Sequence, residues 1–191
     1  MKKILGIMGS PRNNGNTDAL LSELLAGAEQ AGTRTELIRL GEMIIKPCTG
    51  CHACWAGKPC PNRDDMNDLY TRIAAADALV FGTPVYWYGP TALMKGFIDR
   101  FVYFNCPENR PKIAGKTAAV VIPYEETILE TAAPLLTFFE QCLLYLQMQL
   151  AGRLIVPGVT KRGEVREHPH HMKEAFDLGV RLGRVAAARF R

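Results

Sequence analysis

Two hydrophobic patterns alternate along the chain from one end to the other. Short runs rich in apolar residues predict buried strands at residues 3–9, 35–40, 78–83, 116–122 and 149–156. Between them, apolar residues at helical spacing predict helices at residues 17–31, 65–76, 90–102, 127–147 and 167–191. Strands that alternate with helices form a parallel sheet, and fully apolar strands are covered on both faces. The pattern therefore predicts an α/β fold with a three-layer, doubly wound, parallel five-stranded sheet.

The chain is organised as one unit. Its 191 residues fit a single domain over residues 1–191, with no internal repeat and no linker. One long irregular stretch, residues 41–63, is rich in cysteine. Because a loop of this length inside a compact domain is usually functional, we expect it to carry part of a site.

Composition and charge narrow the classes of function. No apolar run reaches the roughly 18 residues of a membrane span, so we expect no membrane partner. The net charge of +4 is small and the basic residues are scattered, so we expect no nucleic-acid partner. The first ten residues lack the long apolar core of a signal peptide. We therefore expect a cytoplasmic protein whose six cysteines stay reduced.

A loop suited to an anion follows the first predicted strand. Residues 9–17 read GSPRNNGNT, and a predicted helix follows at once. The carboxyl ends of strands are where open α/β sheets bind ligands, and a helix N-terminus offers free N–H groups to an anion. Ser10, Asn16 and Thr17 add side-chain donors, and Arg12 adds positive charge. The lysine of GxxxxGK[ST] and the pattern GxGxxG are both missing, so a phosphate monoester fits best.

A second loop, at residues 82–90, follows the third predicted strand with the sequence GTPVYWYGP. Its three consecutive aromatic residues, Tyr86, Trp87 and Tyr88, cannot all face one core. Some of them must cover a planar ligand or a partner chain. Neighbouring phosphate and aromatic loops indicate a flat ring that bears a phosphate tail.

Both loops have a purely structural alternative. The first can be a plain strand-to-helix turn, in which Asn16 or Thr17 merely caps the helix. The second can be an aromatic plug beneath a loop. The phosphate interpretation also requires the Asp18 carboxylate, in the first helical turn, to point away from the anion.

The segments GSPRNNGNT and TPVYWYGPTALMKGFIDR together resemble the NAD(P)H-dependent FMN reductase branch of the flavodoxin-like proteins. The resemblance reaches to about residue 158 and implies the strand order 2-1-3-4-5, bound FMN and a homodimer or homotetramer. The phosphate contacts that it implies are Ser10, Arg12, Asn14, Asn16 and Thr17. The implied contacts to the isoalloxazine ring are Pro84, Val85, Tyr86, Trp87, Tyr88 and Gly89. Tyr124 is a further candidate, although its segment, PYEET, lacks the glycines that are common at this place in the family.

Four cysteines fall within the long loop with the spacing C-x2-C-x2-C-x5-C: Cys48, Cys51, Cys54 and Cys60. A [4Fe–4S] cluster takes four thiolates and often uses x2 steps. A zinc site usually takes two CxxC pairs with a longer insertion, and the loop can also hold no metal at all. Two disulfides are disfavoured in a reducing cytoplasm. The spacing, ahead of Asp64-Asp65-Met66, resembles the compact motif of iron–sulfur flavoproteins and so implies the cluster.

The other cysteines and the histidines carry less information. We expect His52 to be exposed or to lie behind the ligands, and Cys142 to lie in the core. Cys106 has no assigned role. The stretch His168, His170 and His171 is expected to be an exposed helix start.

Three functions follow from these motifs. The first is an iron–sulfur flavoprotein that moves electrons from NAD(P)H or ferredoxin to a small acceptor. The second is a clusterless NAD(P)H-dependent FMN or quinone reductase. The third is a flavodoxin-like electron carrier, which the positive net charge disfavours because short carriers are usually acidic. We assign no catalytic residue, since the hydride chemistry would belong to the flavin.

Overall fold

The computed structural model describes residues 2–188, with side chains described through residue 185. Five strands form one parallel sheet: β1 (Lys3–Met8), β2 (Arg34–Arg39), β3 (Ala78–Gly82), β4 (Thr117–Pro123) and β5 (Gln149–Val156). The strand order is β2-β1-β3-β4-β5. Strands β3 and β4 are buried at every position, which explains their continuous apolar sequence. The predicted fold class and strand order are confirmed.

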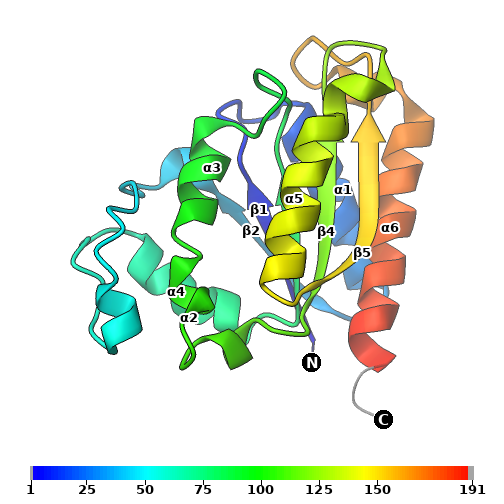
Figure 1. Ribbon diagram of the computed structural model, residues 1–191. Helices are drawn as coiled ribbons and strands as arrows, with labels where there is room; N and C mark the ends of the chain where they lie inside the picture. Colours follow the sequence, from blue (N-terminus) through cyan, green and yellow to red (C-terminus); the bar gives the residue numbers. More distant parts are fainter. Residues whose placement is uncertain (1, 189–191) are drawn as a thin grey trace.

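Helices cover both faces of the sheet and make the three layers visible in Figure 1. One face carries α1 (Asn16–Gln30) and α6 (Pro169–Ala188). The other carries α2 (Met66–Ala75), α3 (Ala92–Asp99), α4 (Val102–Asn105) and α5 (Ala133–Tyr145). Short 3-10 turns are η1 (Leu40–Glu42), η2 (Ala53–Ala56), η3 (Arg110–Lys112), η4 (Leu129–Ala132) and η5 (Glu164–Glu167). Each face has its own hydrophobic core, and no helix within residues 2–188 is long and apolar enough to cross a membrane.

Two predicted helices differ from the observed ones. The helix predicted at 127–147 begins only at Ala133, because Pro134 lacks an N–H and fits the first turn of a helix but not its interior. The helix predicted at 90–102 is divided into α3 and α4, and the side chain of Thr91 caps its start by accepting a hydrogen bond from the Met94 amide. The last three residues predicted for the C-terminal helix, 189–191, lie outside the described residues.

Close packing of α1 against α6 positions the turn that precedes α1. A Cβ at Gly179 would lie 1.8 Å from the Leu24 carbonyl oxygen, and one at Gly27 would lie 2.1 Å from that of Phe176. Only glycine allows the two backbones to approach this closely. As a result, the turn before α1 lies next to the segment that leads from β5 into α6.

Candidate cofactor site

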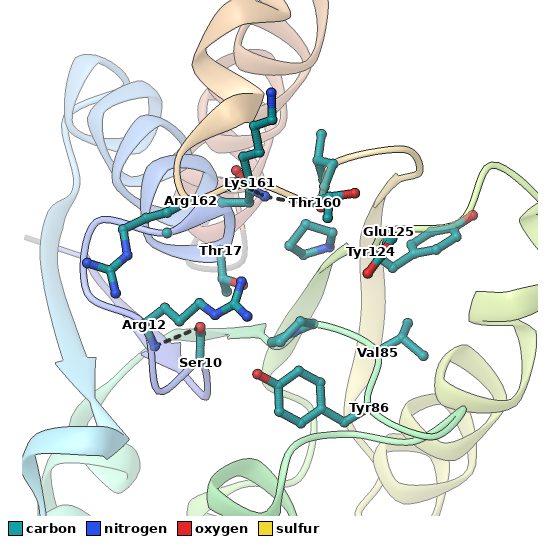
Figure 2. A pocket seen from close by; sticks show the side chains of 15 residues that line it. Ser10, Arg12, Thr17, Val85, Tyr86, Tyr124, Glu125, Thr160, Lys161 and Arg162 are labelled. Carbon is teal, nitrogen blue, oxygen red and sulfur yellow. Dashed lines mark hydrogen bonds between the residues drawn. The ribbon is translucent and has the colours of Figure 1, made fainter.

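An open cavity of about 570 Å³ lies at the carboxyl ends of the strands (Figure 2). Four loops line it, through Ser10, Arg12, Gly15, Asn16, Thr17, Pro84, Val85, Tyr86, Pro123, Tyr124, Glu125, Val159, Thr160, Lys161 and Arg162. Open α/β sheets bind their ligands at this edge.

The N-terminus of α1 is open at one end of this cavity. Its N-cap is Gly15, which makes no side-chain cap hydrogen bond. The first amide N–H groups of a helix have no acceptor within the helix, so here they face the cavity uncapped. Neither Asn16 nor Thr17 caps the helix, so capping does not account for the polar residues of this turn.

Side chains from the same turn surround this end of the cavity. The hydroxyl of Ser10 accepts a hydrogen bond from the Arg12 amide at 3.2 Å, which fixes the turn. Ser10 and Thr17 are buried at the base of the turn, and Figure 2 shows the Arg12 side chain extending beside them. Helix amides, two hydroxyls and a guanidinium therefore converge, and this is a donor set that suits a phosphate group.

The Asp18 carboxylate points away from the cavity. It accepts a hydrogen bond from the Asn14 amide at 2.8 Å and pairs with the Arg39 guanidinium at 2.8 Å. Both oxygens are therefore occupied, and the negative charge is compensated. The condition that the phosphate interpretation placed on Asp18 is met.

Asn16 holds the loop after β5 against the turn before α1. Its amide nitrogen donates to the carbonyl oxygens of Val159 at 3.2 Å and Lys161 at 3.0 Å. Its amide oxygen accepts from the Val165 amide at 3.1 Å. Since both polar ends of the Asn16 side chain are in use, this residue orders the loop after β5 rather than offering a free donor.

Sequence reasoning missed the loop after β5, which brings Thr160, Lys161 and Arg162 to the cavity. The Glu164 carboxylate accepts hydrogen bonds from the amides of Lys161 and Thr160, both at 2.7 Å. These backbone bonds lower the pKa of Glu164. The available signal was the short polar run, TKR, soon after the last strand.

The loops after β3 and β4 line the other end of the cavity. Pro84, Val85 and Tyr86 come from the first, and Tyr124 comes from the second. Figure 2 shows the Tyr124 ring directed away from the centre of the cavity. Its hydroxyl is buried with no hydrogen-bond partner among the described residues, and burial raises its pKa. Tyr124 thus borders the cavity with its backbone side rather than with its hydroxyl.

Trp87 and Tyr88 do not line the cavity. They occupy the tip of a two-residue turn, closed by hydrogen bonds between Tyr86 and Gly89 at 2.9 and 3.0 Å. Both have positive φ, 51° and 62°, which a turn of this kind requires. Their exposed fractions are 97% and 60%, against 42% for Tyr86, so the three aromatics do not share one core.

The structure thus brings together eight of the predicted contacts and leaves four outside the lining. Those inside are Ser10, Arg12, Asn16, Thr17, Pro84, Val85, Tyr86 and Tyr124. Those outside are Asn14, Trp87, Tyr88 and Gly89, because Asn14 precedes the cap and the other three close the turn described above.

The four cysteines line a separate hollow of about 410 Å³: Cys48, Cys51, Cys54 and Cys60. All four are free thiols, and Tyr70, Arg100 and Val102 also line the hollow. Among residues 2–185, no three His, Cys, Asp or Glu side chains already converge on a single metal position. A [4Fe–4S] cluster takes one thiolate at each of four irons and therefore needs sulfurs around a hollow. The donor set fits such a cluster.

The remaining cysteines and histidines have structural surroundings. Cys106 is buried, and its sulfur lies 3.1 Å from the Tyr103 carbonyl oxygen. His52 is exposed, as expected, and lies against the Trp55 ring at the edge of the cysteine hollow. Cys142, on α5, is only partly buried, so the prediction that it lies in the core is wrong. At the start of α6, His171 pairs with Glu174 at 3.2 Å.

Comparison with known proteins gives relatives of two kinds. Iron-sulfur flavoproteins of Archaeoglobus fulgidus and Methanocaldococcus jannaschii are 37% identical over 122 residues and 39% identical over 98 residues. These matches cover 64% and 51% of this chain but only 54% and 51% of those proteins, so the chain spans about half of their length. A Bacillus subtilis protein named as an NAD(P)H-dependent FMN-containing oxidoreductase is 28% identical over 87% of this chain and 91% of its own.

Solved structures support the fold. An NAD(P)H:quinone oxidoreductase from Methanothermobacter marburgensis has a TM-score of 0.78 and 21% identity over 95% of this chain and 98% of its own. An archaeal flavodoxin has a TM-score of 0.62 and 14% identity over 98% and 99% of the two chains. The architecture is therefore flavodoxin-like. The sequence profile of NADPH-dependent FMN reductases matches residues 2–158, and the chain belongs to that family.

Proposed function

We propose that this chain binds FMN in the cavity at the carboxyl edge of the sheet and is an FMN-dependent oxidoreductase. The observation that carries the proposal is the uncapped N-terminus of α1, beside Arg12 and two buried hydroxyls. FMN would supply the redox chemistry, because it accepts a hydride as an electron pair and can pass electrons on singly. The chain itself would bind and orient the flavin and limit its contact with water.

The lining divides the task between two groups of residues. Ser10, Arg12, Thr17 and the first amides of α1 would hold the phosphate, and the loop at residues 160–162 would close over its outer side. Val85 and Tyr86, with residues 123–125, would border the isoalloxazine ring. The apolar ring end and the cationic phosphate end match the two halves of FMN.

The second part of the proposal is a [4Fe–4S] cluster on Cys48, Cys51, Cys54 and Cys60. The hollow that the four thiols line and the names of the archaeal relatives support it. The cluster would accept single electrons from the flavin, so the protein could link NAD(P)H or a ferredoxin to a small-molecule acceptor. A cytoplasmic location, where thiols stay reduced, and a homodimer or homotetramer complete this proposal.

A clusterless NAD(P)H-dependent reductase of FMN or quinones is the second candidate. The relative that covers 87% of this chain and 91% of its own length favours it, since its name carries FMN and no iron–sulfur group. The two candidates share the flavin site and differ in the cysteine hollow alone.

Anaerobic purification followed by an absorption spectrum, iron analysis and sulfide analysis separates the candidates. About four iron and four sulfide per chain, as a [4Fe–4S] cluster contains, with yellow flavin, supports the first proposal. Yellow protein that NADPH bleaches, without iron, supports the second. Flavin that only a protein donor can reduce, without turnover, would indicate a carrier instead of an enzyme.

Replacement of one cysteine tests whether the two sites are separate. Cys60→Ser should remove most of the iron while FMN stays bound, because Cys60 lines the hollow and not the flavin cavity. Cys142→Ser, on α5, is the matched control and should change neither. Equal loss of iron and FMN in Cys60→Ser would contradict two independent sites.

A further inference from the structure

A buried guanidinium lies against the cysteine hollow. Arg100 follows α3 directly, and its side chain is only 1% exposed. It pairs with the Asp64 carboxylate, which is 0% exposed, at a distance of 2.6 Å. Burying two charges is costly unless the geometry satisfies every donor and acceptor around them.

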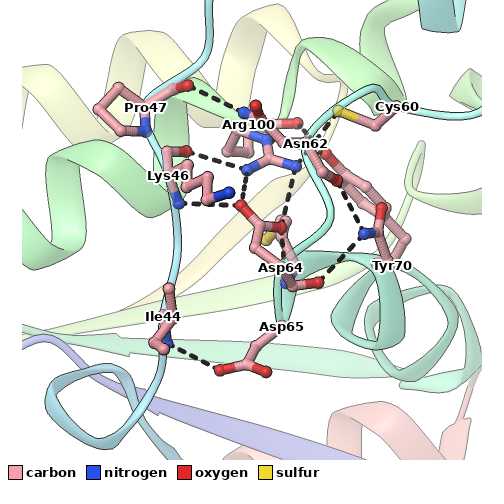
Figure 3. Close-up of polar contacts among 11 residues, drawn as sticks. Ile44, Lys46, Pro47, Cys60, Asn62, Asp64, Asp65, Tyr70 and Arg100 are labelled. Carbon is pink, nitrogen blue, oxygen red and sulfur yellow. Dashed lines mark hydrogen bonds and ion pairs between the residues drawn. The ribbon is translucent and has the colours of Figure 1, made fainter.

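Every N–H group of this guanidinium has an acceptor (Figure 3). Nη1 donates to Asp64 Oδ2 at 2.6 Å and to the Lys46 carbonyl oxygen at 2.9 Å. Nη2 donates to Asp64 Oδ1 and to Cys60 Sγ, both at 3.3 Å. Nε donates to the Tyr70 hydroxyl at 3.3 Å. An arginine has five N–H groups, so all of them donate hydrogen bonds here, and one donates to a sulfur.

The same contacts close the base of the cysteine loop. Lys46 lies two residues before the first cysteine of the set, and Asp64 lies four residues after the last one. Asp64 also accepts the Lys46 amide at 2.8 Å and the Met66 amide at 3.2 Å. Although burial raises the pKa of Asp64, the hydrogen bonds from Arg100 and these amides lower it overall. Arg100 therefore holds both ends of the loop.

We infer that Arg100 is a positioning residue for the cysteine centre: it fixes the Cys60 sulfur and raises the reduction potential of the group bound there. This inference rests on the proposed cluster. A hydrogen bond and a positive charge at a ligand sulfur stabilise the reduced state, which carries one more negative charge. A plain structural ion pair would need only Asp64, and it would leave the sulfur contact without consequence.

The test compares Arg100→Lys with Asp64→Asn. Lysine keeps the charge but cannot bond Asp64, Lys46 and Cys60 together from one planar group. Titration with dithionite, which supplies one electron per cluster, is followed by electron paramagnetic resonance. Arg100→Lys should shift the midpoint potential to more negative values. Asp64→Asn, which removes a nearby negative charge, should shift it to more positive values.

A purely structural role predicts a different result, because loosening the loop would move both potentials in the same direction. That result, or an unchanged potential in Arg100→Lys with iron retained, would overturn the inference. The matched control is Arg72→Lys on α2, whose guanidinium pairs with Asp68 away from the cysteines. It should leave the potential unchanged.

A second measurement covers the case in which the variants lose iron. Hydrogen exchange of residues 46–64 is compared in iron-free, FMN-loaded wild-type protein and Arg100→Lys. Exchange should be at least about tenfold faster in the variant, equivalent to about 1.4 kcal/mol of local opening. Equal exchange rates would refute the positioning role. If wild-type protein binds no iron or sulfide on reconstitution, the proposed cluster fails, and the exchange data still decide whether Arg100 orders the loop.

Discussion

At the residue scale, the phosphate end of the cavity depends on which side chains are already engaged. Asn16 and Asp18 use their polar atoms to fix neighbouring backbone, while Arg12 and Thr17 face the cavity. The site is therefore built from two kinds of polar residue. One kind shapes the loops, and the other would meet the anion.

Arg12→Ala tests the residues that would contact the anion. We expect the affinity for FMN to fall about 10- to 100-fold, because a hydrogen bond to a charged group contributes about 1.5–3 kcal/mol. Titration of the apoprotein, followed by flavin fluorescence, measures it. Arg34→Ala, at the exposed start of β2, is the control and should bind FMN like the wild type. An unchanged affinity in Arg12→Ala would remove this residue from the phosphate site.

Residue types in the turn before α1 predict an anion site, because a strand-to-helix turn has a known place in this architecture. The sequence could not separate Asn16 from Thr17 in role. That difference depends on the carbonyl groups of Val159 and Lys161, which lie more than 140 positions away along the chain. Trp87 shows the same limit, since its exposure follows from the turn that places it and not from its aromatic character.

At the scale of elements, η5 folds back onto the loop after β5 and helps Asn16 to hold that loop at the cavity. Glu164 provides the connection through its bonds to the amides of Thr160 and Lys161. Loss of this acceptor should therefore act on the flavin through the loop alone.

Glu164→Ala should weaken FMN binding severalfold and speed up proteolysis within residues 157–163. Both effects should follow from freeing two loop amides that the carboxylate now fixes. Glu167→Ala, on the same 3-10 turn, provides the control and should have neither effect. Binding and cleavage that match the control would mean that η5 does not order the loop.

The space around each glycine predicts opposite outcomes for two substitutions, one at the contact between α1 and α6 and one in α3. Gly179→Ala places a Cβ 1.8 Å from the Leu24 carbonyl oxygen, so we expect the free energy of unfolding to fall by about 3 kcal/mol or more. Gly96→Ala, inside α3 with open space around it, should instead raise it by about 0.5–1 kcal/mol. Urea unfolding measures both values. Similar stabilities for the two variants would contradict the close approach of these helices.

Periodicity predicted most elements correctly, and its errors have local causes. The strands were predicted to within a residue or two, and the apolar runs of β3 and β4 reflect burial on both faces. The helix at 127–147 was predicted too long because apolar spacing continues through η4. The true start of α5 is set by Pro134, in its first turn. Hydrophobic spacing records which side is buried, and caps decide where a helix begins.

At the scale of the whole molecule, the two sites lie at different places and one helix joins them. The loop that borders the flavin cavity leads into α3 at Thr91, whose hydroxyl donates to the Gly9 carbonyl oxygen at 2.5 Å. The same helix ends at Arg100, against the cysteine hollow. Eight helical residues at 1.5 Å each make α3 about 12 Å long, so the two sites share a rigid element without sharing residues.

The most direct test of the account compares the affinities of the apoprotein for FMN and for riboflavin, which differ only in the phosphate. If α1, Arg12 and the buried hydroxyls hold the phosphate, FMN should bind at least about 100-fold more tightly, equivalent to about 2.8 kcal/mol. That preference should decline in Arg12→Ala. Equal affinities for the two flavins, or no binding of either, would contradict the claim that this turn is a phosphate site.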